Sequence, residues 1–352
     1  MRKETRAADA DRPQWRAARY AIGALVAFGA LYASLSNLSW PEILDAFSRV
    51  SVAWTVAAIL SVLVSLALVT VRWGLLLGAW SWDPALAGFN ARPASRHWGA
   101  LWDSVVVGQA VNIVIPLRFG EGARLAMTTR TVGVPVGRVV VALALERAFD
   151  AAAFATIVLL LIVSGAMPDA FRGVAPSAAL VTLMTLAAVI VFVRVGPAGL
   201  DWLRRRSSLA RGSGWIDRQA VAMREGWTDL AGHSRLVPTA LLTALIPMTA
   251  AATNLLVFQG FGLAVPAIAA LVLLVALQVG TAVVSVPGNI GVFHYLTIVT
   301  LAAWGVPRPA AFAAAVVLHA VALGPKVVLA AISMMAVRGS SHGDARWTSV
   351  GN

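Results

Sequence analysis

The sequence predicts an all-α, polytopic integral membrane protein, and two observations lead to this prediction. Of the 352 residues, 59% are hydrophobic and only 12% are charged, a balance that soluble globular domains do not have. The hydrophobic residues also gather in runs of about 20 residues, the length that an α-helix needs to cross the hydrocarbon core of a bilayer. Short basic loops separate these runs.

The charge of the chain is strongly positive, with 28 Lys and Arg against 16 Asp and Glu and a net charge of +12. The basic residues are spread over many short loops, as in cytoplasmic loops that face anionic lipid. We therefore expect no nucleic-acid partner. The sequence has no Cys, which excludes disulfides, thiolate chemistry and Cys-ligated metal sites.

In chain order, residues 1–19 form a basic N-terminus and residues 20–337 form one membrane domain. Within it we expect about eight transmembrane helices, at 20–37, 52–80, 136–164, 176–195, 236–260, 264–286, 290–304 and 310–337. The loop 196–235 contains a segment, 216–230, that is expected to form a short amphipathic helix on the membrane surface. Residues 338–352 are expected to be a disordered tail.

The segment 98–117 is apolar but has basic residues on both sides. Because Lys and Arg favour the cytoplasmic side, we expect this segment to enter the membrane, break near Pro116 and return to the same side. This re-entrant arrangement keeps every basic loop inside and predicts that both termini are cytoplasmic. The protein is accordingly expected in the cytoplasmic membrane.

The first candidate site is this break, where a sequence apolar enough for a membrane helix is followed directly by Pro, Gly and charged residues. A bilayer core offers backbone groups and charges no water, so such a break is tolerated only inside protein or beside a wet cavity. Arg can bind a phosphate through two N–H groups. The candidate substrate-binding residues are Asn112, Pro116, Arg118, Gly120, Glu121 and Arg124. The alternative is that both arginines are ordinary anchors at a helix end.

The second candidate is the charged group formed by Glu146, Arg147 and Asp150 inside the apolar run 136–164. Glu146 and Asp150 are four residues apart and therefore share a helix face. Ionisable groups in a membrane helix must face the bundle interior and find partners. They would form either a structural ion pair that locks two helices or a gate that exchanges partners during transport.

A second break follows late in the chain, with candidate substrate-binding residues at Pro287, Gly288, Asn289 and Gly291. Three titratable residues come after it, and we assign them to gating: His294, His319 and Lys326. Because His titrates near neutral pH, one interpretation is a proton-linked gate, and the other is hydrogen-bonded packing. No carboxylate stands at ligand spacing, so no metal site is expected. Two such breaks indicate an inverted pseudo-repeat whose halves meet at the broken segments.

Familiar catalytic motifs are missing from the sequence. It contains no Walker A motif, no Gly-x-Ser-x-Gly elbow and no His-Glu-x-x-His zinc motif. We therefore expect a transporter rather than an enzyme, and we expect no cofactor.

Three motifs resemble those of a known family: Asn112-x-x-x-Pro116-x-Arg118-x-Gly120-Glu121-x-x-Arg124, Glu146-Arg147-x-x-Asp150 and Pro287-Gly288-x-x-Gly291. They are similar to the integral-membrane domain of lysylphosphatidylglycerol synthases, over nearly the whole chain from residue 20 to residue 337. That domain also occurs alone, as flippase-like membrane proteins, whereas full-length synthases add a soluble aminoacyl-transferase domain. The resemblance implies lipid translocation and, since the sequence ends at Asn352, no lysyl transfer.

Two departures from the family pattern fall on charged positions. His294 stands where the family has a Glu, after Asn289 has replaced a Gly, and His319 stands where the family has an Arg. The resemblance therefore implies that the lipid headgroup, or its coupling to protons, differs from that of the better-known members.

We expect the protein to flip an anionic phospholipid or a polyprenyl-phosphate-linked sugar between leaflets. Arg118 and Arg124 would hold the phosphate, and the charged residues near them would form a switching ion-pair network. His294 and His319 would line the second half of the cavity. The expected partners are membrane lipids or lipid-linked sugars, together with a glycosyltransferase or another enzyme of envelope biosynthesis.

Two alternatives remain open. The first is a membrane-embedded transferase that uses a polyprenyl-phosphate donor; the outside loops argue against it, because they are short and carry only Glu42, Asp45 and Asp169 as acids. The second is a non-transporting accessory subunit of cell-envelope assembly. The oligomeric state stays undetermined.

Overall fold

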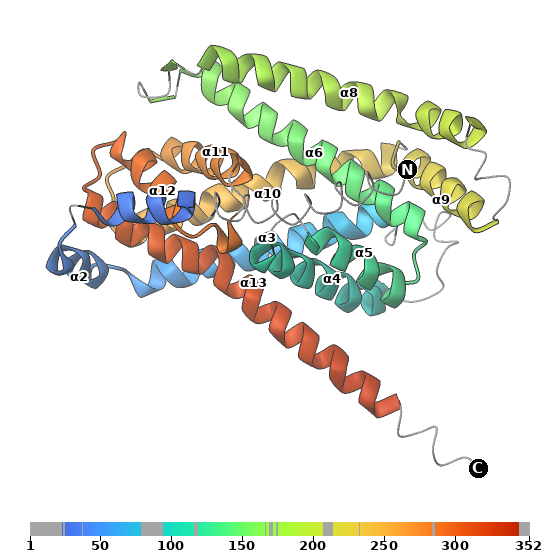
Figure 1. Cartoon of the computed structure of the whole chain (residues 1–352), viewed down its shortest axis with the longest axis horizontal. Coiled ribbons are helices and arrows are strands. Elements are labelled where there is room, and N and C mark those ends of the chain that lie inside the picture. The colour runs from blue at the N-terminus through green and yellow to red at the C-terminus, as the bar shows by residue number, and fades with distance from the viewer. Residues whose placement is uncertain are drawn as a thin grey trace, which may run out of the picture.

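The computed structural model describes residues 23, 25–36, 38–78, 94–115, 119–165, 167–168, 172–173, 175–206, 214–231, 233–283 and 286–344. Within these residues the regular structure is helical (Figure 1). The labelled helices are α2 (Trp40–Ser48), α3 (Val52–Leu77), α4 (Ala94–Val114), α5 (Phe119–Thr131), α6 (Val136–Val163), α8 (Ala175–Arg206), α9 (Gly214–Ala231), α10 (His233–Gly260), α11 (Ile268–Val283), η3 (Pro287–Asn289), α12 (Val292–Ala302) and α13 (Arg308–Asp344).

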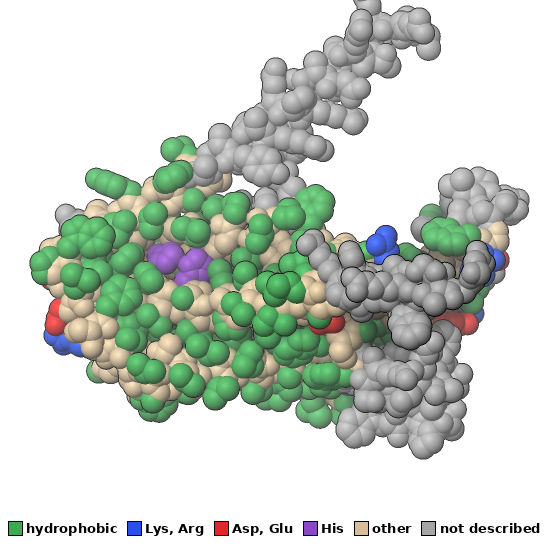
Figure 2. Space-filling model, turned by 90° about the horizontal axis from the view of Figure 1, so that it is seen from below, with side chains coloured by type: hydrophobic (Ala, Val, Ile, Leu, Met, Phe, Trp, Pro, Cys, Tyr) green, Lys and Arg blue, Asp and Glu red, His purple; other side chains and the backbone are tan. Residues whose placement is uncertain are grey.

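Four of these helices are long and apolar enough to cross a membrane: Val52–Leu77, Ala175–Trp202, Arg235–Gly260 and Arg308–Ala336. Much of their apolar surface faces outward, and Figure 2 shows hydrophobic side chains over most of the visible described surface. Exposing such an apolar surface to water costs free energy, whereas contact with the hydrocarbon of a bilayer does not. The prediction of an all-α polytopic membrane protein is confirmed.

Several boundaries agree with the predicted ones. α3 begins at Val52, as expected for 52–80, and α10 ends at Gly260, as expected for 236–260. A helix, α9, covers the segment 216–230. The tail differs from its prediction in part, because α13 continues through residues 338–344, while residues 345–352 lie outside the described residues.

α4 and α5 form a tight hairpin around the first break. Each approaches the other so closely at Gly108 and Gly120 that a Cβ atom on Gly120 would collide with the carbonyl oxygen of Gly108. The backbone N–H of Gly120 donates a hydrogen bond of 2.8 Å to Oδ1 of Asn112. α4 and α5 thus fold back on each other on the two sides of the predicted break.

α11 and α12 form a second hairpin around the second break, where two crossings were expected. α11 has 16 residues and α12 has 11, which makes them about 24 Å and about 17 Å long, less than the hydrocarbon thickness of about 30 Å. Gly280 of α11 lies against Leu296 of α12, so the two helices pack together near the break. The backbone has positive φ at Gly288, Asn289 and Gly291, a conformation that a right-handed α-helix does not contain. Within the described residues, two short apolar helices thus stand where the sequence predicts full crossings at 264–286 and 290–304.

α3 and α10 lie side by side at the centre of the bundle. The hydroxyl of Ser61 donates to the carbonyl oxygen of Thr249 over 3.0 Å, and the hydroxyl of Thr253 donates to Ser61 over 3.1 Å. Small residues let the two backbones approach each other in this way. One hydrophobic core joins α3 and α10 to α11, α12 and α13, and a second joins α3 to α4, α6 and α9.

α9 is docked on the bundle. Gly137 donates its backbone N–H to Oε1 of Gln219 over 2.8 Å, and Trp227 packs against Gly196 of α8. Arg138 extends from the start of α6 to the carbonyl oxygen of Leu77, the last residue of α3, over 2.8 Å. These contacts tie the end of α3 to α6 and α9 on one side of the molecule.

Candidate functional site

A buried network of ion pairs joins α3, α5 and α6. Its centre is Glu146 of α6, whose side chain is 3% exposed. Arg72 of α3, also 3% exposed, places Nη2 at 3.1 Å from Oε1 of Glu146 and Nη1 at 2.5 Å from Oδ1 of Asp150. The same guanidinium donates to the hydroxyl of Thr243 on α10 over 3.2 Å. Arg72 therefore links three helices at one point.

Arg124 of α5 approaches Glu146 from the other side. Its Nη1 lies 2.9 Å from Oε2 and 3.1 Å from Oε1 of that carboxylate. Its guanidinium carbon also lies 3.7 Å above the ring of Trp73, a cation–π contact. Glu146 is consequently held between two guanidinium groups, which offsets the cost of burying its charge.

The outer edge of the network is open to solvent or lipid headgroups. Arg147 is 40% exposed and lies 3.1 Å from Glu121 of α5 and 3.3 Å from Asp150. Counted over the described residues, the network has three arginines and three carboxylates. The charges balance, so no net charge is buried within this part of the molecule.

The hairpin contact explains why α5 can place Arg124 inside. A side chain at Gly108 or Gly120 would hold α4 and α5 apart, and Gly108 also lies against the Cβ of Arg124. Asn112 fixes the start of α5 by accepting the Gly120 N–H. The small residues thus set the depth of the Arg124 side chain, and Asn112 acts on the backbone at the break.

Several donors of the network have no acceptor among the described residues. These are Nε and Nη2 of Arg124 and Nε of Arg72. Buried N–H groups are nearly always paired with protein, water or ligand. The network can therefore accept further oxygen atoms, such as those of a phosphate or of ordered water, without first losing an ion pair.

The structure brings together five predicted residues in this network: Glu121, Arg124, Glu146, Arg147 and Asp150. Pro116 and Arg118 lie outside the described residues. The sequence analysis missed Arg72, although an Arg in the middle of the apolar run 52–80 is itself a signal of a functional or paired residue.

The second break carries a histidine pair. Nε2 of His319 on α13 lies 2.8 Å from the carbonyl oxygen of Gly288 in η3. The ring centroids of His294 and His319 are 4.9 Å apart, and Phe293 stacks on His319 at 4.7 Å. Figure 2 shows the two histidines side by side on a hydrophobic face. Nδ1 of His294 is buried and has no hydrogen-bond partner among the described residues.

The other predicted residues of the second break lie around this pair. Gly291 is in tight contact with the backbone of Ala27, which packs the helix Leu25–Leu35 against the start of α12. Pro287 and Asn289 belong to η3, which packs against α4. Lys326, two turns along α13 from His319, has no ion pair within the described residues. The two breaks thus approach one another through α4 and η3, although they hold separate clusters.

The comparison with known proteins supports the motif resemblance. A family model described as the lysylphosphatidylglycerol synthase TM region matches residues 20–330, nearly the whole chain. No curated protein matches the chain.

Proposed function

We propose a lipid-translocating function, from the premise that the chain belongs to the family of the lysylphosphatidylglycerol synthase TM region. The substrate is an anionic phospholipid or a polyprenyl-phosphate-linked sugar, and the protein moves it between leaflets of the cytoplasmic membrane. One observation supports this most strongly: a buried ion-pair network with unused guanidinium N–H groups lies beside a broken hairpin. Such sites in transporters bind polar groups at membrane depth.

In this proposal, Arg118 and Arg124 hold the phosphate of the headgroup. Arg124 takes the phosphate through its unused Nε and Nη2 groups. Glu146 stays charge-compensated, because Nη1 of Arg124 and Nη2 of Arg72, at 2.9 Å and 3.1 Å, still pair with it. Arg147 and Asp150 would exchange partners at the open edge of the network. Because the described network is neutral, the extra positive charge for an anionic headgroup comes from Arg118.

The two hairpins support an alternating mechanism. α4–α5 and α11–α12 are both broken near their turns, and α4 packs against η3 between them. We propose that they form an inverted pseudo-repeat, with α4–α5 entering from the cytoplasmic side and α11–α12 from the opposite side. Both termini are then cytoplasmic, and the breaks meet near the bilayer midplane, where transporters commonly hold substrate.

The test of this function is lipid movement in proteoliposomes that contain purified protein and a panel of labelled phospholipids and polyprenyl-phosphate sugars. Arg118→Ala should reduce movement more than tenfold, since a charge-assisted phosphate contact contributes about 1.5–3 kcal/mol. Arg130→Ala is the matched control, because Arg130 is exposed on the last turn of α5. Normal transport by folded Arg118→Ala protein would overturn the proposed role of Arg118. No movement of any lipid by folded wild-type protein would favour the accessory-subunit alternative.

A second prediction concerns His319. His319→Leu removes the hydrogen bond to Gly288 and should slow transport, because η3 is then no longer tied to α13. His319→Gln can still donate to that carbonyl oxygen and should retain a larger part of the activity. Transport rates of both variants in the same proteoliposomes measure the difference. Equal rates for the two variants would show that the hydrogen bond does not control the second break.

A further inference from the structure

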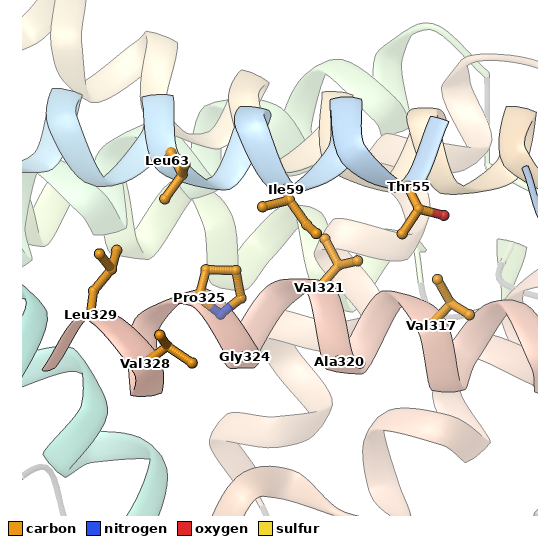
Figure 3. A pocket seen from close by; sticks show the side chains of 10 residues that line it. All are labelled: Thr55, Ile59, Leu63, Val317, Ala320, Val321, Gly324, Pro325, Val328 and Leu329. Atoms are coloured by element: carbon orange, nitrogen blue, oxygen red, sulfur yellow. The ribbon is translucent and has the colours of Figure 1, made fainter. Parts of the chain in front are cut away.

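A groove outside both charged clusters runs between α3 and α13 (Figure 3). Its volume is about 600 Å³, within the range of ligand-binding sites. Thr55, Ile59 and Leu63 line one wall. The facing wall comes from α13, with Val321, Gly324 and Val328, and the two helices run in the same direction along it.

The walls of the groove suit hydrocarbon. Thr55 has the only hydroxyl among the lining side chains, and it donates to the carbonyl oxygen of Ser51 over 3.0 Å. A water molecule would need two to four polar partners, which these walls do not supply. Gly324 has no side chain, and a Cβ there would meet nothing within 4 Å, so this position leaves part of the groove open.

The position of the groove matches one leaflet of a bilayer. Thr55 lies in the first turn of α3, and Leu63 lies eight residues further on, about 12 Å along the helix axis. One leaflet contributes about 15 Å of hydrocarbon. Trp54, the neighbour of Thr55 in the chain, is exposed, and Trp is enriched where membrane meets water. The groove therefore runs from the interface toward the midplane, as a lipid chain does.

We propose that this groove binds one acyl chain of a membrane phospholipid, with the glycerol at the end near Thr55. Both walls belong to helices that are long and apolar enough to cross a membrane, and the lining residues Ala320 and Val328 are exposed at the surface. Mass action fills such a site with the most abundant chain that fits, and phospholipids supply most chains of a bilayer. The inference goes beyond the proposed function, because a bound chain does not require that this lipid be transported.

The experiment uses the full chain in vesicles of phospholipid that carries a photoactivatable group on one acyl chain. After irradiation, mass spectrometry maps the cross-linked peptides. We expect the cross-links to concentrate on the groove-lining segments of α3 and α13. The lipid-facing helix α8, which is mostly exposed, serves as the internal comparison. Equal labelling of α8 would show ordinary surrounding lipid and would overturn the proposal.

Gly324→Leu tests occupancy directly, since Gly324 lines the groove and a Cβ at this position meets nothing within 4 Å. It should reduce groove cross-links about tenfold, the effect of displacing about two buried CH₂ groups. Ala331→Leu is the matched control, because Ala331 is exposed on the same helix and does not line the groove. Unchanged labelling in folded Gly324→Leu protein would overturn the proposal.

Competition in the wild-type protein gives an independent result that does not depend on any variant. A polyprenyl phosphate, added at the same mole fraction as the labelled phospholipid, should leave the ratio of groove cross-links to α8 cross-links unchanged. A selective loss of the groove cross-links would overturn the choice of occupant. Arg118→Ala should label like the wild type. Loss of transport with retained labelling in this variant would support the role of Arg118 in transport and, separately, the binding of a lipid chain in the groove.

Discussion

Glu146→Ala should lower the free energy of unfolding by about 3–5 kcal/mol, the usual cost of removing one partner from a buried ion pair. The change leaves Arg72 and Arg124 facing each other without the carboxylate that lies 3.1 Å and 2.9 Å from them. Both guanidinium groups are buried, so bulk water does not replace the lost carboxylate. Unfolding by a denaturing detergent, followed by circular dichroism, measures the loss.

Two further variants make this prediction specific. Glu121→Ala removes a carboxylate from the open edge of the same network, where the side chain is 29% exposed, so the change in unfolding free energy should stay within about 1 kcal/mol. Glu146→Gln keeps the shape of the side chain but not its charge. Its loss of unfolding free energy should lie between those of Glu146→Ala and Glu121→Ala. If Glu146→Ala and Glu121→Ala unfold alike, the network does not hold the three helices together.

Much of the fold follows from hydrophobic runs of sufficient length. The run beginning at Val52 and the run ending at Gly260 identify α3 and α10. A membrane helix makes all its backbone hydrogen bonds within itself, so a long apolar composition is enough to recognise it. The break near Pro116 was also predictable from the arginines around it. The second break was predictable from Pro287 and Gly288, but the short lengths of α11 and α12 were not, because neither helix contains an Asp, Glu, Lys or Arg that would mark its end.

The candidate site was predictable as a set of residues but not as a set of contacts. Charges within an apolar run indicate that Glu146 and Asp150 face the interior. Their shared partner, Arg72, is 74 positions from Glu146 in the sequence, and only the packing of α3 against α6 brings them together. The same holds for His319 and Gly288, which are 31 positions apart. The spacing of charged residues shows which face of a helix points into the protein. Which helix packs against that face depends on the tertiary structure.

Gly120→Ala and Gly122→Ala should change stability in opposite directions. Within a helix, Ala is more favourable than Gly by about 1 kcal/mol, and both positions lie in α5. A Cβ at Gly122 meets nothing within 4 Å, so Gly122→Ala should gain most of that amount. A Cβ at Gly120 would overlap the carbonyl oxygen of Gly108 and press on Asn112. Such overpacking typically costs about 1–3 kcal/mol, which outweighs the gain.

The consequence of Gly120→Ala for function should exceed its effect on stability. Separating α4 from α5 withdraws Arg124 from Glu146, since the Cβ of Arg124 itself lies in the contact with Gly108. Transport should therefore fall more than tenfold in Gly120→Ala and stay near the wild-type rate in Gly122→Ala, with thermal unfolding of both proteins recorded in the same detergent. A stabilised and active Gly120→Ala protein would show that α4 and α5 do not pack through these glycines, and that the depth of Arg124 is set by another contact.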